Sequence, residues 1–313
     1  MSSPSAATLH ITNGDSVLYL FRKAGVTGTN LAWRDALHEG PVPGGLTLEE
    51  TSGRRAMYLA QRGLGNPIKL FHDFSQRDAT LRRAADFARV VLWFEHDLYD
   101  QLQLLQILFE IEKMSLDPGH VTSIQSDRYL GSMTADELVA MRSHERTLTK
   151  ATADVARETW DAFTAEDPTR LAECAQHDAR GLPHLRAAML RLCEEFPSTR
   201  DGLSRSERHA LQAVEQGPAR IEELFERSQA REEASFLGDR MFEAILSDLR
   251  TGPSPLIEGE QILEPTALGR RVLAGDADWL EHREPDRWVG GSHIDADFAF
   301  RWNEDARAFE RKA

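Results

Sequence analysis

Two carboxylates and an imidazole stand together at Glu95, His96 and Asp97, directly after the apolar run of residues 89–94. In an extended segment, residues i and i+2 point to the same side, so Glu95 and Asp97 are expected to present their carboxylates together. Such a pair can hold Mg²⁺ or divide acid and base roles, with His96 as a further proton carrier. A structural role is equally open for Asp97, because it would cap the leucine-rich helix predicted for residues 98–114.

A second polar group, WRDALHEGPVP, follows the apolar residues 30–33. Its Asp35 and His38 are candidates for catalysis, and Trp33 and Glu39 are candidates for ligand contact. A histidine among acids can serve as a base, a metal ligand or a hydrogen-bond donor to a substrate. It can also simply hold a loop in place, and the sequence leaves both interpretations open.

A third group, Asn13-Gly14-Asp15-Ser16, lies between the apolar LHIT and a helical pattern. Glycine permits close backbone approach, and free N–H groups at a helix start attract anions, so all four residues are candidates for ligand contact. The spacing fits neither a GxGxxG motif nor a P-loop, which excludes those nucleotide sites. A plain N-cap role for Asp15 or Ser16 is the more ordinary expectation.

Three further side chains are candidates for ligand contact. Asp100 and Gln101 lie in the first turn of the helix after Asp97, close to the predicted site. Arg200, in the second half of the chain, suits an anion, although a surface ion pair is the more ordinary role. His10 lies inside the first predicted strand and is expected to be a hydrogen-bonded core histidine.

The elements that must position these groups alternate between strand and helix over the first 130 residues. This order predicts an α/β fold with a small, open, mostly parallel sheet flanked by helices. Right-handed crossovers place the carboxyl ends of all strands at one edge, where ligands bind in such sheets. The three polar groups and Ser126-Asp127-Arg128 are therefore expected to meet at one site.

The remaining pattern predicts further units after an α/β (Rossmann-like) domain over residues 1–142. Helical periodicity without strands predicts a helical connector over residues 143–198. Residues 199–280 show three helices, two short apolar runs around a glycine and a last helix, which is typical of a winged-helix-like α+β domain. Residues 281–313 contain DRWVGGSHI and FAFRW, which predict a closing C-terminal β-hairpin.

Three separated stretches, LHITNGDS, WRDALHEGPVP and LWFEHDLYDQLQLLQIL, resemble a bacterial family known as the domain of unknown function 1835. The stretch EFPSTRDGLSRSE in the second half resembles the longer members of that family. The resemblance extends over most of the chain. It brings no catalytic residues with it, so the site depends on the chemistry of its side chains.

Charge and composition restrict the partners. The net charge of −14 disfavours nucleic acid, and residues 201–280 carry nine Lys or Arg against sixteen Asp or Glu, a net of −7. DNA is therefore disfavoured even for the winged-helix-like part, and a protein partner or a homo-oligomer remains open. No apolar run is long enough to cross a membrane. The two cysteines lack CxxC spacing and the N-terminus has no secretion signal, so a cytoplasmic location is expected.

Two functions follow from these patterns. The first is an enzyme that uses a divalent metal or acid–base groups on a nucleotide-like or phosphorylated small molecule. The sequence does not identify a cofactor, but Glu95 and Asp97 are candidate ligands for a divalent metal such as Mg²⁺. The second is a ligand-sensing regulator whose winged helix contacts protein rather than DNA. A scaffold without a ligand is a third function that the sequence leaves open.

Overall fold

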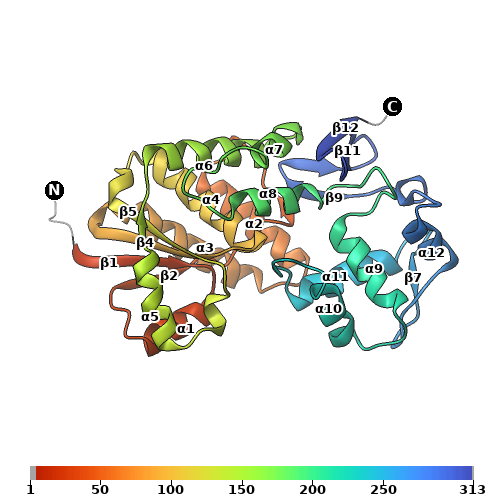
Figure 1. Ribbon diagram of the computed structural model, residues 1–313, viewed down its shortest axis with the longest axis horizontal. Helices are drawn as coiled ribbons and strands as arrows, with labels where there is room; N and C mark the ends of the chain where they lie inside the picture. Colours follow the sequence, from red (N-terminus) through yellow and green to blue (C-terminus); the bar gives the residue numbers. More distant parts are fainter. Residues whose placement is uncertain (1–4, 312–313) are drawn as a thin grey trace.

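The protein is described here by a computed structural model over residues 5–311. Its largest sheet has five strands in the order β2-β1-β4-β5-β6, and the first four of these run parallel. The strands are β1 (Ser5–Thr12), β2 (Thr29–Ala32), β4 (Phe87–Glu95), β5 (Val121–Ser126) and β6 (Arg146–Thr147). The predicted α/β fold with a mostly parallel sheet is confirmed (Figure 1).

Strand β4 lies at the centre of this sheet because its sequence is apolar on both faces. Val90, Leu92 and Phe94 point into one core, and Val91 and Trp93 point into the other. Alternate residues of a strand face opposite sides, so a continuous apolar run can only be satisfied between two layers of helices. All five side chains are fully buried.

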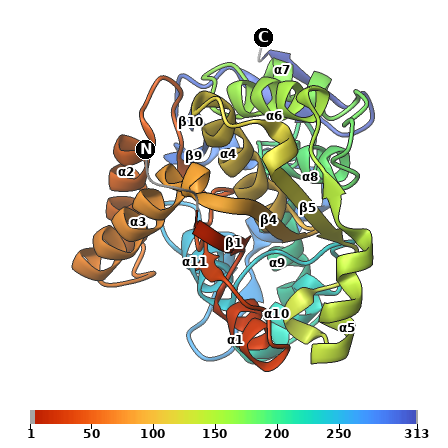
Figure 2. The ribbon, with the colours of Figure 1, turned by 90° about the vertical axis from the view of Figure 1, so that its left-hand side faces the viewer.

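Helices cover both faces of the sheet, as the end-on view shows (Figure 2). One face is covered by α1 (Asp15–Lys23) and α5 (Ala135–Ala140). The other is covered by α4 (Leu98–Lys113), α6 (Lys150–Phe163), α7 (Thr169–Cys174) and α8 (Leu185–Cys193). The helices α2 (Leu48–Gln61) and α3 (Pro67–Arg82) pack against each other, and α3 packs beside β2. Short 3₁₀ turns span Ala84–Asp86, Pro118–His120, Leu130–Ser132, Met141–His144 and Trp279–Glu281.

Three of the helix starts follow their local sequence signals and one does not. Thr47 and Thr134 form capping boxes, as the Thr-x-x-Glu spacing of TLEE (47–50) and TADE (134–137) predicts. Asp97 caps α4 by accepting a hydrogen bond from the Asp100 N–H. The exception is α1, where the expected cap by Asp15 or Ser16 is wrong. The helix begins at Asp15, so Gly14 is the N-cap, and glycine has no side chain that could accept a capping hydrogen bond.

The segment predicted as an entirely helical connector begins with a strand. Arg146 and Thr147 form β6, which pairs antiparallel with β5 at the edge of the sheet. The helical pattern of residues 143–198 is therefore interrupted at its start, and this corrects the prediction. Two residues are too few to show an alternating pattern, so the strand could only be found from its partner.

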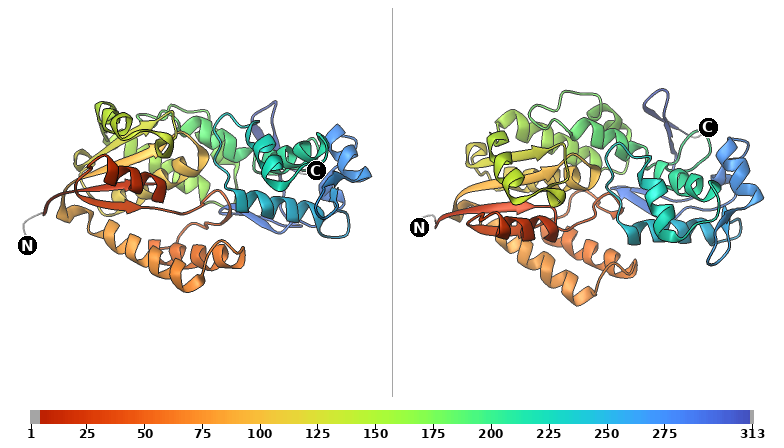
Figure 3. Two further views of the ribbon diagram at one scale, coloured as in Figure 1. Left: turned by 90° about the horizontal axis from the view of Figure 1, so that it is seen from below. Right: turned by 60° about the horizontal axis from the view of Figure 1, so that its bottom comes forward.

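Residues 205–274 form a second helical unit with its own core. Its helices are α9 (Arg205–Glu215), α10 (Ile221–Gln229), α11 (Asp239–Arg250) and α12 (Ala267–Ala274). Between α11 and α12, β7 (Ile257–Glu258) and β8 (Glu264–Pro265) pair antiparallel. Figure 3 shows this unit beside the sheet, at the end where the parallel strands finish.

The C-terminal tail forms two hairpins, which corrects the single closing hairpin expected for residues 281–313. In the first, β9 (Arg287–Gly290) pairs with β10 (Ser292–Ile294), and β9 also pairs in parallel with β3 (Gly40–Pro41). In the second, β11 (Phe300–Asn303) pairs with β12 (Ala308–Arg311). Each apolar stretch of the tail thus has its own partner, and the tail returns to the N-terminal part of the chain.

None of the helices within residues 5–311 combines the length and the apolar character that a membrane crossing requires. The first four and the last two residues of the predicted domains lie outside the described part of the chain.

Candidate metal centre and ligand cavity

A cavity of about 380 Å³ is lined by residues at the ends of β1 and β4 and by residues of the second helical unit. Its walls are formed by Asn13, His38, Glu95, Asp97, Tyr99, Asp100, Tyr129, residues 235–238 and Met241. Three of the four predicted polar loops thus contribute a side chain, and Tyr129 comes from the segment directly after the fourth. The structure therefore brings three of the four predicted loops together, whereas Ser126, Asp127 and Arg128 do not line the cavity.

Three carboxylates form the acidic wall of this cavity. Glu95, Asp97 and Asp100 each place one carboxylate oxygen within 4.8 Å of the others. Their side chains are almost wholly buried, with relative exposures of 5%, 3% and 1%. An oxygen cluster of this kind matches the ligands that Mg²⁺ and similar hard cations prefer.

The backbone at the end of β4 positions these carboxylates. Asp100 accepts hydrogen bonds from the Glu95 N–H (2.7 Å) and from Asn13 Nδ2 (2.8 Å). Glu95 Oε1 accepts from the Leu130 N–H (2.7 Å), and Asp97 Oδ1 caps α4. Each carboxylate is therefore oriented by a backbone N–H, and we name the three residues the carboxylate trio.

Burial disfavours the ionised form of all three carboxyl groups in the trio. Desolvation raises the pKa of Glu95, and it raises the pKa of Asp97 to about 7, with repulsion from Glu95 as a further cause. Desolvation also raises the pKa of Asp100 well above its usual range, and Asp97 adds repulsion. Like charges this close cannot all ionise without a cation, so the trio either retains protons or binds a metal.

His38 lies in the wall of the same cavity and has no hydrogen-bond partner. It is 5% exposed, and neither ring nitrogen contacts a donor or acceptor among the described residues. Its ring packs edge-on against Phe236, with a centroid distance of 5.0 Å. Desolvation lowers the pKa of His38 to about 3, so the imidazole is neutral at physiological pH.

Asp35, predicted as a catalytic partner of the trio, instead forms a buried ion pair outside the cavity lining. Its Oδ1 lies 3.0 Å from Arg55 Nε, and both side chains are fully buried. The same guanidinium donates to the carbonyls of Ala36 (2.7 Å) and Glu39 (2.5 Å), on either side of His38. The pair therefore shapes the loop that presents His38.

The other residues of the first two loops are dispersed. Asp15 forms an exposed ion pair with Arg34, and Gly14 and Ser16 do not line the cavity. Trp33 is buried and donates its indole N–H to Gln106 Oε1 at 2.7 Å. Glu39 lies in a neighbouring cavity, where it accepts a hydrogen bond from Tyr58 (2.6 Å) and pairs with Arg62 (3.0 Å).

The remaining predicted residues also lie outside the cavity lining. His96 is half-buried, with its ring near Tyr129 and His184. Gln101 is fully buried and donates to the backbone carbonyl of Glu95, so it holds the backbone of one residue of the trio. Arg200 is exposed and donates to the Leu273 carbonyl at the end of α12. An extended backbone sends neighbours to opposite sides, which separates His96 from Glu95 and Asp97.

Some residues of the cavity wall were not predicted from the sequence. The connection between α10 and α11 supplies Ser235, Phe236, Leu237 and Gly238, and Met241 follows in α11. Tyr129 Oη donates to the Ser235 carbonyl at 2.9 Å, which links this connection to the sheet edge. These side chains are apolar or small and lie more than a hundred residues from the trio in the chain. No local signal marks them as site residues.

These features define an α/β protein with a buried carboxylate cluster at the carboxyl edge of its parallel sheet. No protein-family model and no curated protein matches the sequence. A similar solved structure is the DNA-binding, cleavage and re-ligation domain of topoisomerase II from Plasmodium falciparum, with a TM-score of 0.47 and 12% sequence identity. The match covers 81% of this chain and 44% of that one, and this likeness is too low to carry an argument. The resemblance to the domain of unknown function 1835 family stays a prediction.

Proposed function

We propose that the protein is a metal-assisted enzyme that acts on a nucleotide-like or phosphorylated small molecule at the carboxylate trio. The observation that carries this proposal is the meeting of three buried carboxylate oxygens within 4.8 Å. A cation at this place neutralises their repulsion, and it offers its free coordination positions to an anionic substrate. Without a cation, the same acidic wall repels a phosphate group.

The residues differ in the roles that their positions support. Glu95, Asp97 and Asp100 hold the cation, and Asn13 orients Asp100 through its 2.8 Å hydrogen bond. His38 is the neutral acid–base group that faces the same cavity. Neither Asp35 nor His96 lines the cavity, so any catalytic role of these two residues would be indirect. The two cysteines are free thiols, which fits the expected cytoplasmic location.

Isothermal titration of the full chain with Mn²⁺ tests the metal centre. Asp97→Asn keeps the N-cap oxygen and Glu95→Gln keeps the acceptor for the Leu130 N–H, so both variants should fold. Each should weaken Mn²⁺ binding by at least about tenfold, because one anionic ligand is lost. Asp15→Asn is the matched control, since Asp15 is an exposed carboxylate outside the cavity. Equal Mn²⁺ affinity of all four proteins would contradict the metal centre.

Turnover is tested separately from metal binding. We expect release of phosphate or another product from one member of a panel of nucleotides and sugar phosphates, in the presence of Mg²⁺ or Mn²⁺. Activity should be lost with a chelator and in Asp97→Asn, and it should persist in Asp15→Asn. Thermal stabilisation of the Mn²⁺-loaded protein by a member of the panel, without turnover of that compound, would argue against the enzyme and for a sensor.

A ligand-sensing regulator is the second candidate, and the connection between α10 and α11 favours it. This connection forms part of the cavity wall, so a bound ligand contacts the second helical unit directly. Three helices followed by the β7–β8 pair and α12 support the winged-helix interpretation of that unit. Its surplus of acidic residues supports a protein partner rather than DNA.

Hydrogen exchange distinguishes the regulator from a plain enzyme. In a regulator, Mn²⁺ together with a binding phosphate compound should slow amide exchange in residues 230–250 and also at α12, far from the cavity. Protection confined to residues that line the cavity would contradict the regulatory proposal and leave the enzyme.

A further inference from the structure

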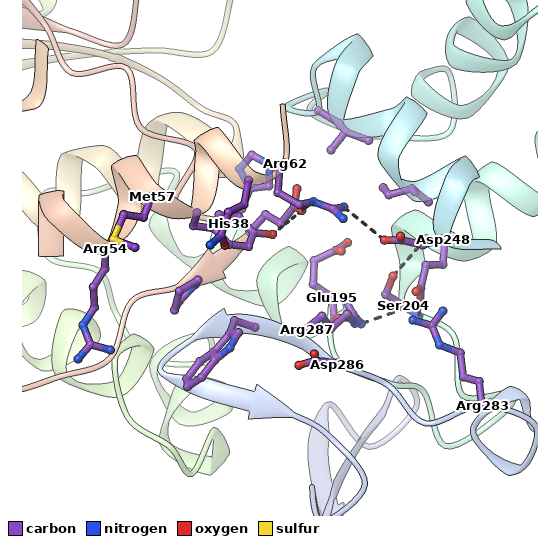
Figure 4. Close-up of a pocket in the computed structure, with 18 residues that line it drawn as sticks. His38, Arg54, Met57, Arg62, Glu195, Ser204, Asp248, Arg283, Asp286 and Arg287 are labelled. Carbon is purple, nitrogen blue, oxygen red and sulfur yellow. Dashed lines mark hydrogen bonds and ion pairs between the residues drawn. The ribbon is translucent and has the colours of Figure 1, made fainter. Parts of the chain in front are cut away.

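A second cavity, of about 480 Å³, adjoins the cavity of the carboxylate trio. It lies where α2, the second helical unit and the tail come together, and Figure 4 shows residues from all three around it. His38 and Leu237 belong to the lining of both cavities. His38 therefore stands at the junction between the trio and the second cavity.

The unpartnered ring of His38 points to a ligand. A neutral imidazole has one donor and one acceptor nitrogen, and buried polar groups nearly always find partners. Both nitrogens of His38 are buried and without a partner among residues 5–311. Its ring makes T-shaped contacts with the rings of Phe236 and Tyr99, with centroid distances of 5.0 Å and 6.1 Å. A molecule that spans the junction would supply the missing partners.

Two of the arginines that line the second cavity are not used in ion pairs among the described residues. Of its five carboxylates, Glu39 and Asp248 share Arg62, Glu195 pairs with Arg191, Glu207 lies 3.9 Å from Arg287, and Asp286 contacts His293. By contrast, Arg54 and Arg283 form no ion pair in the described part of the chain, and one Arg283 guanidinium nitrogen is buried without a partner. Figure 4 shows these two arginines on opposite sides of the cavity. The uncompensated arginines suit an anionic group.

We infer that the two cavities form one site for a ligand with two anionic ends, one bridged by a cation to the trio and the other held by Arg54 or Arg283. His38 donates and accepts hydrogen bonds at the middle of this ligand. The inference rests on the proposed metal centre. It restricts the substrate of the proposed enzyme to small molecules with two phosphate groups, or with a phosphate and a carboxylate at opposite ends.

The test is titration of the Mn²⁺-loaded full chain with alkanediol bisphosphates of increasing length, compared with alkyl monophosphates of the same lengths. A bisphosphate of one preferred length should bind at least about tenfold more tightly than its monophosphate, which corresponds to one additional charge-assisted contact. Arg54→Gln or Arg283→Gln should remove this preference. Arg142→Gln is the matched control, because Arg142 is exposed and outside both cavities.

His38→Phe separates a ligand contact from a structural role. The phenyl ring keeps the ring volume but has no nitrogens, so bisphosphate affinity should fall at least about tenfold. The melting temperature should stay equal or rise, because two unpartnered polar atoms leave the interior. A lower melting temperature, or bisphosphate affinity within twofold of the parent, would overturn the assignment of His38.

The outcomes distinguish the inference from the proposed function. If Mn²⁺ does not bind, the metal centre fails and the inference fails with it. If Mn²⁺ binds but monophosphates and bisphosphates bind equally at every length, the metal centre stands and the two-ended ligand is refuted.

Discussion

Single side chains show that burial alone does not separate structural from functional carboxylates. Asp35 and Asp97 are both almost fully buried. Asp35 has Arg55 at 3.0 Å as its counter-ion, whereas Asp97 has two further carboxylates and no cationic side chain in the trio. A charge that is already compensated inside the protein has a structural role, while an uncompensated cluster requires protons or a metal.

Substitution should reveal this difference in stability measurements. Asp35→Ala leaves Arg55 as an unpaired buried charge and should lower the free energy of unfolding by about 3–5 kcal/mol. Asp97→Asn removes a repelling charge and keeps the cap, so the metal-free protein should be as stable as the parent or more stable. Urea denaturation measures both. A comparable loss in the two variants would contradict the distinction.

His10 is a buried histidine with a purely structural environment, as its place inside a strand predicts. Its Nδ1 accepts a hydrogen bond from the Trp93 indole (3.1 Å), and its Nε2 lies 3.2 Å from the Thr27 carbonyl. Desolvation lowers the pKa of His10 to about 4. The imidazole therefore stays neutral in the folded protein at a pH where it is protonated in the unfolded chain.

This pKa predicts a pH dependence of stability. Between pH 6.5 and 4 the unfolded state binds a proton that the folded state does not, so the free energy of unfolding falls with decreasing pH by up to about 1.4 kcal/mol per unit. His10→Asn keeps an acceptor for Trp93 and removes this titration. Denaturation at several pH values should show a shallower acid loss in the variant, with the remainder due to His38 and to carboxylates whose pKa is lowered in the folded state, such as Glu137 and Glu232. Identical slopes would refute the assignment.

At the scale of elements, the connection from β2 to β3 depends on a glycine. Gly40 has a φ of 83°, and a Cβ atom there would lie 2.3 Å from Tyr58 Cε1. Tyr58 in turn donates to Glu39. The chain can make this turn closely against α2 only without a side chain, and the turn places His38 at the junction of the two cavities.

Gly40→Ala should therefore disturb this connection. A left-handed backbone and a contact with an aromatic ring should together lower the free energy of unfolding by roughly 1–3 kcal/mol. Gly45→Ala is the control, because Gly45 also has a positive φ but meets no atom within 4 Å. Thermal melting of both variants measures the contribution of the close approach, and an equal effect would show that only the backbone conformation matters.

At the scale of the whole molecule, the site is assembled from distant parts of the chain. The sheet edge supplies the trio, the second helical unit supplies Phe236 and Leu237, and the tail reaches the second cavity through Trp288. Pairing of β9 with β3 fixes the tail to the loop after His38. Neither half of the chain contains a complete ligand site.

Overall charge makes a further prediction about partners. The chain carries a net charge of −14, so we expect neutralisation of DNA phosphates to contribute little to the binding free energy. We expect mixed-sequence duplex DNA to bind with a dissociation constant above about 10⁻⁴ M at moderate salt. Fluorescence anisotropy with labelled duplex measures it. Tight binding that weakens steeply with salt would contradict the charge argument.

The sequence by itself determined the parallel sheet, the helix caps at Thr47, Thr134 and Asp97, and the meeting of polar loops at one edge. These features follow from local periodicity and capping chemistry and from the fixed handedness of the crossovers. Only the tertiary structure decided that Asp100 joins the trio while Asp35 and His96 do not. Counter-ions, cavity walls and the second strand of a pair come from distant segments, and no local pattern encodes which charge will find a partner.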